Sequence, residues 1–494
     1  MAENLKPEDA KPVTPVLVED KIVTTKHSVR IAGKDIKYTV TTGTIVLRSE
    51  TTDRELDTKP EAARATVFFT AYTRDGVKDL TKRPITFSFN GGPGSASIWL
   101  HLGALGPRKV RMGDVDQLLA PPYGLEDNEF SILDQTDLVF IDPVSTGFSR
   151  ATEGVKAKDF HGIKPDIESV GDFIRLYTSR NQRWLSPKFL AGESYGTTRA
   201  AGLSGYLQDR HGLYLNGLML ISSILDFSTA RFEPGHDLPY ILFLPTYTAT
   251  AWYHKKLSPS LQKDLAKTLK LAEEFASGEY AAALFKGSSL TVKEHESVLK
   301  QLSQFTGISE TFLERANFRL EIFRFCKELL RDQGRTVGRL DSRFKGIDRD
   351  RAGENFEFDP SHAAISGAYS AAFNHYVRNE LGFESDLPYN IINMRVWPWS
   401  YTDYENRFVN VGETMRKAMS SNPHLKVIVA NGYFDLATPY FATDYTFKHL
   451  ALDPSLEPNI RMTYYPAGHM MYVHAPSLEQ LKNDLSAFIQ DSLK

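Results

Sequence analysis

Short apolar runs alternate with amphipathic stretches along the first half of the chain. Residues 137–142 (DLVFID), 188–192 (KFLAG) and 217–222 (GLMLIS) have the length and composition of buried strands. Residues 166–180 repeat apolar side chains at helical spacing, and a second helix is predicted from about residue 197 to 208. Because strands and helices alternate in this way, the pattern predicts a mainly parallel sheet that helices cover on both faces.

The pattern changes twice further along the chain. Residues 27–90 carry strand signals, with alternating side chains on either side of Gly-containing turns. From about residue 230 to 401 the signals are mostly helical. Strand–helix alternation then returns, with strands at 424–432 and 461–468 and a closing helix within 476–492. The predicted fold class is therefore α/β, with a large helical insertion in the core.

These changes divide the chain into four parts. We expect a disordered lead-in over 1–25, the first part of the core over 26–229, the mainly helical insertion over 230–400 and the second part of the core over 401–494. The lead-in is polar and proline-rich, a composition that does not form a packed core.

Two helix starts in the insertion carry recognisable signals. Ser258 and Pro259 offer an N-cap followed by a first-turn proline. Thr291 and Glu294 have the spacing of a capping box. We expect a helix to begin at each place.

Composition narrows the range of partners. The 494 residues are 41% hydrophobic and 24% charged, which allows a sizeable core. The formal net charge of −3 offers no basic field for nucleic acid or an anionic lipid surface. No stretch approaches the roughly 20 apolar residues of a membrane-spanning helix. We therefore expect neither a nucleic-acid partner nor a membrane span, and the sequence does not predict the oligomeric state.

The single cysteine limits the chemistry further. Cys326 excludes an intrachain disulfide and a cysteine-based metal site. It lies in EIFRFCKELL, which predicts a helix, so we expect a buried structural thiol. No spacing along the chain indicates a metal or nucleotide site, and no cofactor is expected. Asp359 and His362 alone do not make a set of metal ligands, and His362 is interpreted as a surface histidine.

Ser194 lies in AGESYGT, a G-x-S-x-G pattern between a predicted strand and a predicted helix. A sharp strand-to-helix turn lifts the hydroxyl above the sheet, and small neighbours leave it accessible. The amide groups at the start of the following helix point toward developing negative charge. The pattern therefore indicates a nucleophilic serine.

A serine nucleophile requires a base and an acid that orients the base. Asp435 follows the predicted strand 424–432, and His469 follows the strand at 461–468. Each residue alone has an ordinary structural explanation, as a helix cap or a loop histidine. Their order after Ser194, each at a strand end, favours a Ser194–His469–Asp435 triad.

An oxyanion hole needs two backbone donors. The N–H of Tyr195, directly after the candidate nucleophile, is one. NGGPGSAS (90–97) follows a strand, and its glycines let the backbone approach a substrate closely. A tight turn is the structural alternative, but beside a triad the N–H of Gly92 is the favoured second donor.

Five motifs carry a resemblance to a known family. NGGPGSAS, DPVSTGFS (142–149), GESYGT (192–197), NGYFD (431–435) and AGHMMY (467–472), in this order, resemble the serine carboxypeptidase family of α/β-hydrolases, as a member of bacterial type. The resemblance covers the chain from about residue 65 to its end, apart from the insertion. It implies an α/β-hydrolase fold in which the insertion forms the lid.

The resemblance also implies the roles of several residues. It supports the Ser194–His469–Asp435 triad and an oxyanion hole from the backbone of Gly92 and Tyr195. It further implies that Asn90, the backbone of Gly91 and Glu193 form a subsite for the terminal carboxylate of a peptide substrate. Met470, next to the candidate base, is either a substrate contact or a core residue, and we include it among the substrate contacts.

A role for Glu193 in this subsite implies that peptide binding depends on pH. A carboxyl group binds a substrate carboxylate only when one of the two is protonated, because like charges at hydrogen-bond distance disfavour joint ionisation. The family is therefore expected to prefer acidic pH for peptides. The alternative is that Glu193 is an acid at the start of a helix, stabilised by the helix dipole.

The sequence departs from the family pattern at this same subsite. Members that bind peptide C-termini usually carry a second glutamate after NGGPG, and Ala104 occupies that place here. Ser88 and Ser95 replace a typical tryptophan and cysteine. His101 is either a substitute partner for Glu193 or a packing residue. Trp397 and Trp399 either line a leaving-group pocket or pack.

These features define the expected function. The leading hypothesis is a serine carboxypeptidase-like exopeptidase acting on peptides, and the alternative is a carboxylesterase or acyltransferase acting on small esters with the same triad. Ala104 and Ser88 favour the alternative, whereas Asn90, Gly91 and Glu193 favour the exopeptidase. A catalytically inactive binding protein on the same fold is disfavoured by the intact motifs. We expect a periplasmic or secreted protein if a signal peptide has been removed, and a cytoplasmic one otherwise.

Overall fold

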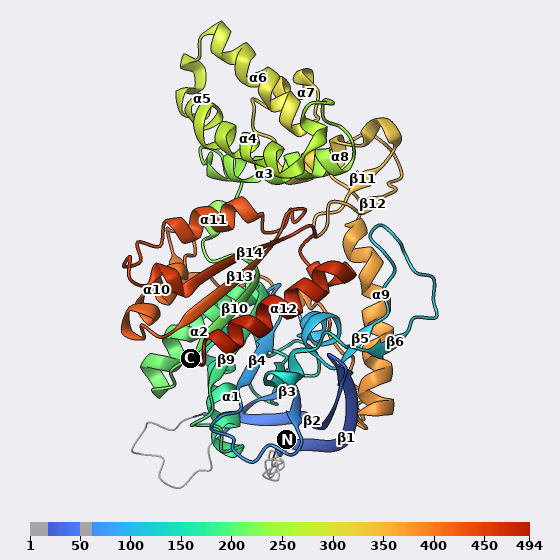
Figure 1. The fold of residues 1–494 in the computed structure, drawn as a ribbon, viewed down its shortest axis with the longest axis vertical. Coiled ribbons are helices and arrows are strands. Elements are labelled where there is room, and N and C mark those ends of the chain that lie inside the picture. The colour runs from blue at the N-terminus through green and yellow to red at the C-terminus, as the bar shows by residue number, and fades with distance from the viewer. Residues whose placement is uncertain (1–17, 50–61) are drawn as a thin grey trace, which may run out of the picture.

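The computed structural model describes residues 18–49 and 62–494, which form a central β-sheet with helices on both faces and a further group of helices at the top of the view (Figure 1). The strands, in spatial order, are β1 (Lys21–Ile31), β2 (Lys34–Arg48), β3 (Ala63–Arg74), β7 (Asp137–Ile141), β4 (Ile85–Phe89), β9 (Lys188–Ser194), β10 (Gly217–Ser223), β13 (Lys426–Gly432) and β14 (Ile460–Tyr465), and β8 (Arg150–Ala151) pairs with β3.

The directions of the strands confirm the predicted sheet. β1, β2 and β3 pair antiparallel, as does β3 with β7. From β7 onward all neighbours are parallel. The carboxyl ends of β4, β9, β10, β13 and β14 therefore meet at one edge, where ligands bind in open α/β sheets.

Both faces of the sheet are covered because alternate side chains of the buried strands point to opposite sides. In β9, Phe189 and Ala191 pack into one apolar cluster and Leu190 into another. The first cluster includes side chains of α9 (Pro360–His375) and α12 (Ala475–Asp491). The second includes those of α1 (Ile163–Arg180), α2 (Tyr195–His211) and α10 (Gly412–Ser421).

The helices of the insertion have an apolar cluster of their own. They are α3 (Leu238–Tyr253), α4 (Leu265–Phe275), α5 (Ala281–Lys286), α6 (Val292–Thr306), α7 (Glu310–Arg315) and α8 (Ile322–Glu328), followed by the hairpin β11 (Thr336–Val337) and β12 (Lys345–Gly346). Cys326 is buried in this cluster, as predicted, and burial raises the pKa of its thiol. The remaining elements are α11 (Tyr440–Lys448) and the hairpin β5 (Arg108–Val110) and β6 (Leu125–Asp127).

One of the two predicted helix starts is correct. Thr291 and Glu294 form a complete capping box at the start of α6. The prediction at Ser258 and Pro259 is wrong, because α4 begins later and its N-cap is Asp264, whose side chain accepts from the N–H of Lys267. A carboxylate directly at the helix start satisfies a free N–H and suits the helix dipole.

The four predicted parts of the chain can be compared with the helices and strands of the structure. β1 begins at Lys21, inside the predicted lead-in, and residues 1–17 lie outside the described residues. The limits of the insertion at 230 and 400 stay a prediction. Within that range, α9 packs against the sheet rather than with the other helices (Figure 1). In the part of the chain that the structure describes, every helix is too short or too polar to cross a membrane.

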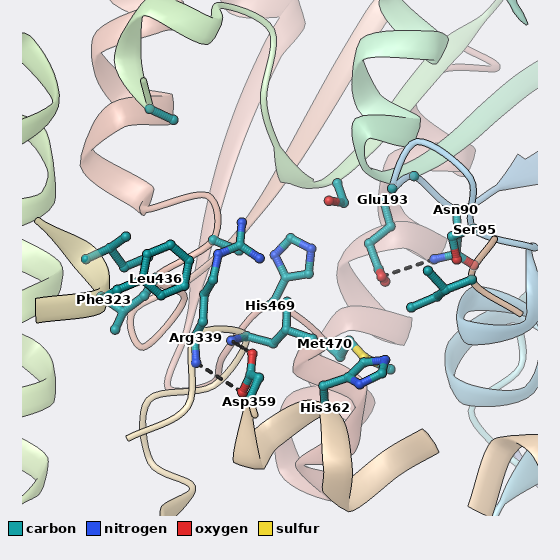
Figure 2. Close-up of a pocket in the computed structure, with 18 of the residues that line it drawn as sticks. Asn90, Ser95, Glu193, Phe323, Arg339, Asp359, His362, Leu436, His469 and Met470 are labelled. Atoms are coloured by element: carbon teal, nitrogen blue, oxygen red, sulfur yellow. Dashed lines mark hydrogen bonds between the residues drawn. The ribbon is translucent and has the colours of Figure 1, made fainter. Parts of the chain in front are cut away.

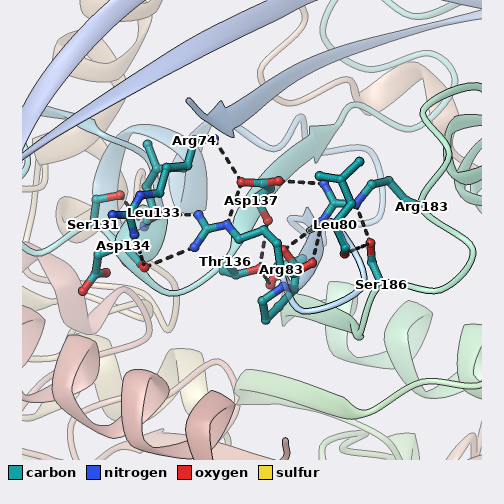
Figure 3. A network of polar contacts seen from close by, with 12 residues as sticks. Arg74, Leu80, Arg83, Ser131, Leu133, Asp134, Thr136, Asp137, Arg183 and Ser186 are labelled. Atoms are coloured by element: carbon teal, nitrogen blue, oxygen red, sulfur yellow. Dashed lines mark hydrogen bonds and ion pairs between the residues drawn. The ribbon is translucent and has the colours of Figure 1, made fainter. Parts of the chain in front are cut away.

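A buried ionic network holds the amino ends of the parallel strands together (Figure 3). Asp137, the first residue of β7, binds Nε of Arg83 at 3.0 Å and Nη1 of Arg183 at 2.6 Å. Arg183 also donates to the carbonyl of Arg83 at 2.7 Å, and Arg83 to that of Leu133 at 2.6 Å. These contacts lie at the opposite end of the strands from the edge where ligands bind. The network therefore stabilises the sheet without contributing to that edge.

We predict that Asp137→Asn destabilises the protein by about 3–5 kcal/mol, because two buried guanidinium groups lose their shared counter-ion. Urea denaturation measures the change. Asp35→Asn, in the exposed pair with Arg30, is the matched control and leaves the stability unchanged. A similarly small effect of Asp137→Asn would show that the network does not stabilise the sheet.

Candidate active site

Ser194 lies at a sharp turn between β9 and α2. Its backbone has φ 61° and ψ −131°, a strained conformation for a residue with a side chain. The flanking glycines make the turn possible, because a Cβ on Gly192 would lie 2.2 Å from the carbonyl oxygen of Gly196. The turn places Ser194 at the carboxyl edge of the sheet and at the amino end of a helix.

The glycine loop after β4 packs directly against this turn. A Cβ on Gly91 would lie 2.4 Å from the backbone N of Tyr195, so only glycine allows this approach. Gly92 has φ +104°, a conformation that also favours glycine. Within the described residues, the N–H groups of Gly92 and Tyr195 have no hydrogen-bond acceptor. Both are thus free to bind an oxyanion.

A buried arginine fixes the start of the glycine loop. Arg199, on α2, donates to the carbonyl of Asn90 at 2.6 Å. It also forms a bidentate pair with Asp166 at 2.8 and 3.1 Å. The amide oxygen of Asn90 accepts from the N–H of Leu100 at 3.0 Å, which turns the amide nitrogen toward Glu193.

His469 and Asp435 form a buried pair. Nδ1 of His469 lies 2.7 Å from Oδ2 of Asp435, which is fully buried. Oδ1 of Asp435 accepts the N–H groups of Ala437 and Thr438 at 2.8 and 3.0 Å, and the Thr438 hydroxyl donates to Oδ2 at 2.7 Å. These bonds satisfy the carboxylate and hold it against the imidazole. Nε2 of His469 remains available to accept a proton.

Charges around His469 set its basicity. Burial lowers the pKa of the imidazole, but the charge and hydrogen bond of Asp435 outweigh burial, and the charge of Glu193 adds to them. Arg339 acts in the opposite direction. The net pKa lies above the ordinary 6.5. The neutral base is therefore formed only as the pH rises through this higher value.

Glu193 is a buried carboxyl group with one orienting contact. The amide nitrogen of Asn90 donates to its Oε1 at 3.1 Å (Figure 2). Burial raises the pKa of Glu193 to about 7, although nearby His469, Tyr472 and Asn90 lower it. Oε2 has no hydrogen-bond partner among the described residues. The group is therefore partly protonated at neutral pH and has an unused oxygen.

Two tyrosines pack against Gly103, the residue before Ala104, where the family's second glutamate would stand. A Cβ on Gly103 would lie 2.4 Å from the ring of Tyr472 and 2.5 Å from the hydroxyl of Tyr369. The Tyr472 hydroxyl approaches Glu193 without the geometry of a full hydrogen bond, and neither it nor Oε2 has another partner in the described chain. The sequence offered no signal for this arrangement, because Tyr472 and Tyr369 are far from Ala104 along the chain.

His101 is a packing residue and not a partner for Glu193. Its Nε2 lies 2.6 Å from the hydroxyl of Tyr72, and its ring stacks on Phe140. Burial lowers its pKa to about 3. The histidine is therefore neutral at all ordinary pH values.

The candidate residues face one cavity of about 990 Å³. Those predicted from the sequence are Asn90, Gly91, Gly92, Glu193, Ser194, His469 and Met470. Asp435 lies behind His469, and the ring of Tyr195 points away and packs edge-on against Trp399 at 5.6 Å. The insertion adds Arg339 to the lining, which sequence patterns did not indicate.

Two weaker predictions are resolved by the same geometry. His362 is not a surface histidine, because α9 places it half-buried in the cavity wall (Figure 2). Trp399 is buried and packs, whereas Trp397 is 42% exposed, and neither lines the cavity. Ser88 is buried and its hydroxyl has no partner among the described residues. No group of three or more potential metal ligands occurs in residues 18–49 and 62–494.

A mixed sheet, a strained serine at a strand–helix turn and a histidine–aspartate pair after later strands define the α/β-hydrolase class. Residues 56–473 match the family described as serine carboxypeptidase. The chain therefore belongs to the serine carboxypeptidase family.

Individual relatives agree with this assignment. The chain is 24% identical to serine carboxypeptidase-like 34 of Arabidopsis thaliana over 413 residues, which cover 76% of this chain and 70% of that protein. It is 32% identical to the pheromone-processing carboxypeptidase KEX1 of Saccharomyces cerevisiae over 160 residues, which cover 31% of this chain but only 20% of the yeast protein.

The fold also resembles a solved structure. The crystal structure of a prohormone-processing carboxypeptidase, KEX1(delta)p from Saccharomyces cerevisiae, matches with a TM-score of 0.56 and 18% identity, covering 92% of this chain and 91% of that chain. The α/β-hydrolase fold implied by the sequence motifs is thus confirmed.

We predict that Glu193→Gln stabilises the protein above neutral pH. A carboxyl group with a folded pKa of about 7 and an ordinary value of 4.5 opposes folding once it is ionised in both states. The free energy of unfolding of Glu193→Gln equals that of the wild-type protein below pH 4.5. The difference between them grows between pH 4.5 and 7 and reaches about 3 kcal/mol above pH 7.

Urea denaturation of both proteins from pH 4 to pH 8 measures this difference. Glu479→Gln, at an exposed position on α12, is the control and shows no such rise. The same difference at pH 5 and pH 8 would contradict a buried, titrating Glu193.

Proposed function

We propose that the protein removes C-terminal residues from peptides through an acyl-enzyme on Ser194. One observation carries the proposal beyond the family assignment. The buried carboxyl of Glu193, oriented by Asn90, faces the same cavity as Ser194 and His469. A carboxyl with a pKa of about 7 is protonated below neutral pH and then donates to a substrate carboxylate.

In this mechanism Oγ of Ser194 attacks the carbonyl carbon of the last peptide bond while Nε2 of His469 takes the hydroxyl proton. Asp435 holds the imidazole and stabilises its charged form. The N–H groups of Gly92 and Tyr195 stabilise the negative oxygen of the tetrahedral intermediate.

The intermediate collapses as His469 gives its proton to the leaving amine. The peptide bond breaks, and the rest of the peptide stays bound as an ester of Ser194. Water then attacks this ester, with His469 again as the base, and regenerates the free serine.

The terminal carboxylate of the substrate is bound by the amide nitrogen of Asn90, the N–H of Gly91 and protonated Glu193. Met470 lies in the same cavity wall and contacts the leaving residue. Peptide binding and base catalysis then require opposite proton states, because Glu193 must be protonated and His469 must be neutral.

The second candidate is an esterase or acyltransferase that uses the same triad. It is favoured by Ala104, which removes the second acid of the carboxylate subsite, and by the two tyrosines that pack against the neighbouring Gly103. We also propose a member of bacterial type. This is supported by the presence of one cysteine in the whole chain, which leaves no disulfide of the kind found elsewhere in the family.

We predict that an N-blocked dipeptide with a free carboxylate is cleaved faster than its C-terminal amide, and that this preference falls about tenfold between pH 6 and pH 8. The reason is the ionisation of Glu193, whose protonated fraction falls about tenfold over this range around a pKa of about 7. The measurement is kcat/KM for the dipeptide, its amide and an aryl ester across pH.

Ser194→Ala is the control and abolishes turnover of all three substrates. Fast ester cleavage without peptide cleavage would overturn the exopeptidase in favour of the esterase. Activity that survives in Ser194→Ala would overturn the triad.

A further inference from the structure

Arg339 belongs to a segment of the insertion that is joined to the catalytic loops through its backbone. Its N–H donates to Asp359 at 3.2 Å, and its carbonyl accepts from the N–H of Leu436 at 3.1 Å. The carbonyl of the next residue, Leu340, accepts from the N–H of His469 at 2.6 Å. The position of Arg339 relative to the proposed triad is therefore fixed.

The side chain of Arg339 extends into the cavity beside the ring of His469 (Figure 2). Arg339 is half-buried, and its guanidinium group has no hydrogen bond or ion pair within residues 18–49 and 62–494. Asp359 does not neutralise it, because this carboxylate caps α9 and accepts backbone N–H groups at the other end of the arginine (Figure 2).

This unpaired state contrasts with the buried arginines elsewhere in the protein. Arg83, Arg183, Arg199 and Arg343 each pair with an aspartate at 3.0 Å or less. Removing a guanidinium from water is costly unless an anion compensates it, and a carboxylate fits its planar donors best. The guanidinium group of Arg339 is thus available to bind an anion from outside the chain.

The place of Arg339 indicates which part of a substrate supplies that anion. Figure 2 shows Arg339 and the Asn90–Glu193 pair on opposite sides of His469. A substrate whose terminal carboxylate lies against Asn90 and Glu193 therefore reaches Arg339 with a different group. The residues at the scissile bond pass beside His469, since this histidine protonates the leaving amine. Their side chains are the groups within reach.

We infer that Arg339 binds a side-chain carboxylate carried by one of the two residues that flank the scissile bond, and that the protein selects acidic peptides. This inference rests on the proposed function and names its substrate class. Glu233 and Glu321 also line the cavity, but neither forms an ion pair with Arg339. A basic substrate would have to place its cation next to the guanidinium, which like charges disfavour.

The test compares N-blocked dipeptides with Glu, Gln or Lys at the last position, and a second set with these residues at the penultimate position. Ester analogues of both sets are measured in parallel. In the wild-type protein we expect kcat/KM for Glu to exceed that for Gln at least about tenfold in one set, with Lys the poorest. In Arg339→Gln this ratio falls to within about twofold of one, and Arg339→Lys keeps part of it.

Arg231→Gln is the matched control, because Arg231 also lines the cavity but its guanidinium lies over the ring of Phe227 at 5.5 Å. This variant keeps the Glu-to-Gln ratio. The inference is overturned if Arg339→Gln leaves the ratio unchanged in both sets, or if it alters only the preference for a free terminal carboxylate over its amide. Failure of the proposed function is seen separately, as absence of wild-type peptide cleavage while the ester sets still report on Arg339.

Discussion

The site depends on a backbone-to-backbone contact between the glycine loop and the turn at Ser194. Gly91 lies so close to the N of Tyr195 that any side chain would force the two segments apart. The contact brings two unpaired N–H groups together above the sheet, which is the arrangement that an oxyanion needs. It is maintained from behind by Arg199, which joins α2 to the carbonyl of Asn90. The strain at Ser194 is therefore held by packing and ion pairs that lie outside the cavity.

Buried charged groups are fully paired at the amino ends of the parallel strands but not at their carboxyl ends. At the amino ends, Asp137 is surrounded by two guanidinium groups and leaves no polar group unsatisfied. At the carboxyl ends, Glu193 keeps one oxygen without a partner in the described chain, and burial raises its pKa. Incomplete solvation of this kind reduces stability but leaves a group ready for a substrate. The ionic network at one end thus offsets the functional strain at the other.

Much of this could be predicted from the sequence, because the signals are local. Each signal occupies a segment of fewer than about ten residues: the turn at Ser194, the glycine loop, and the strands before Asp435 and His469. Parallel strands then bring the ends of these segments to one edge of the sheet. The surroundings of Glu193 could not be predicted in this way. Tyr369 and Tyr472 reach it through packing between distant segments, and Arg339 lies in a part of the insertion where no sequence motif indicated a functional residue. The start of α4 was predicted wrongly, because the serine–proline pair at 258–259 has the composition of a helix start but the helix begins after Asp264.

The segment of the insertion at Arg339 and Leu340 affects both the choice of substrate and the basicity of His469. Leu340 accepts the N–H of His469, and the adjacent Arg339 carries a charge that lowers the pKa of that histidine. Glu193 acts on the same imidazole with the opposite sign from the other side. A bound carboxylate at Arg339 would cancel part of its charge and so raise the basicity of His469. An acidic substrate would then strengthen the base that takes the proton of Ser194, whereas a neutral substrate would leave the guanidinium uncompensated and the base weaker.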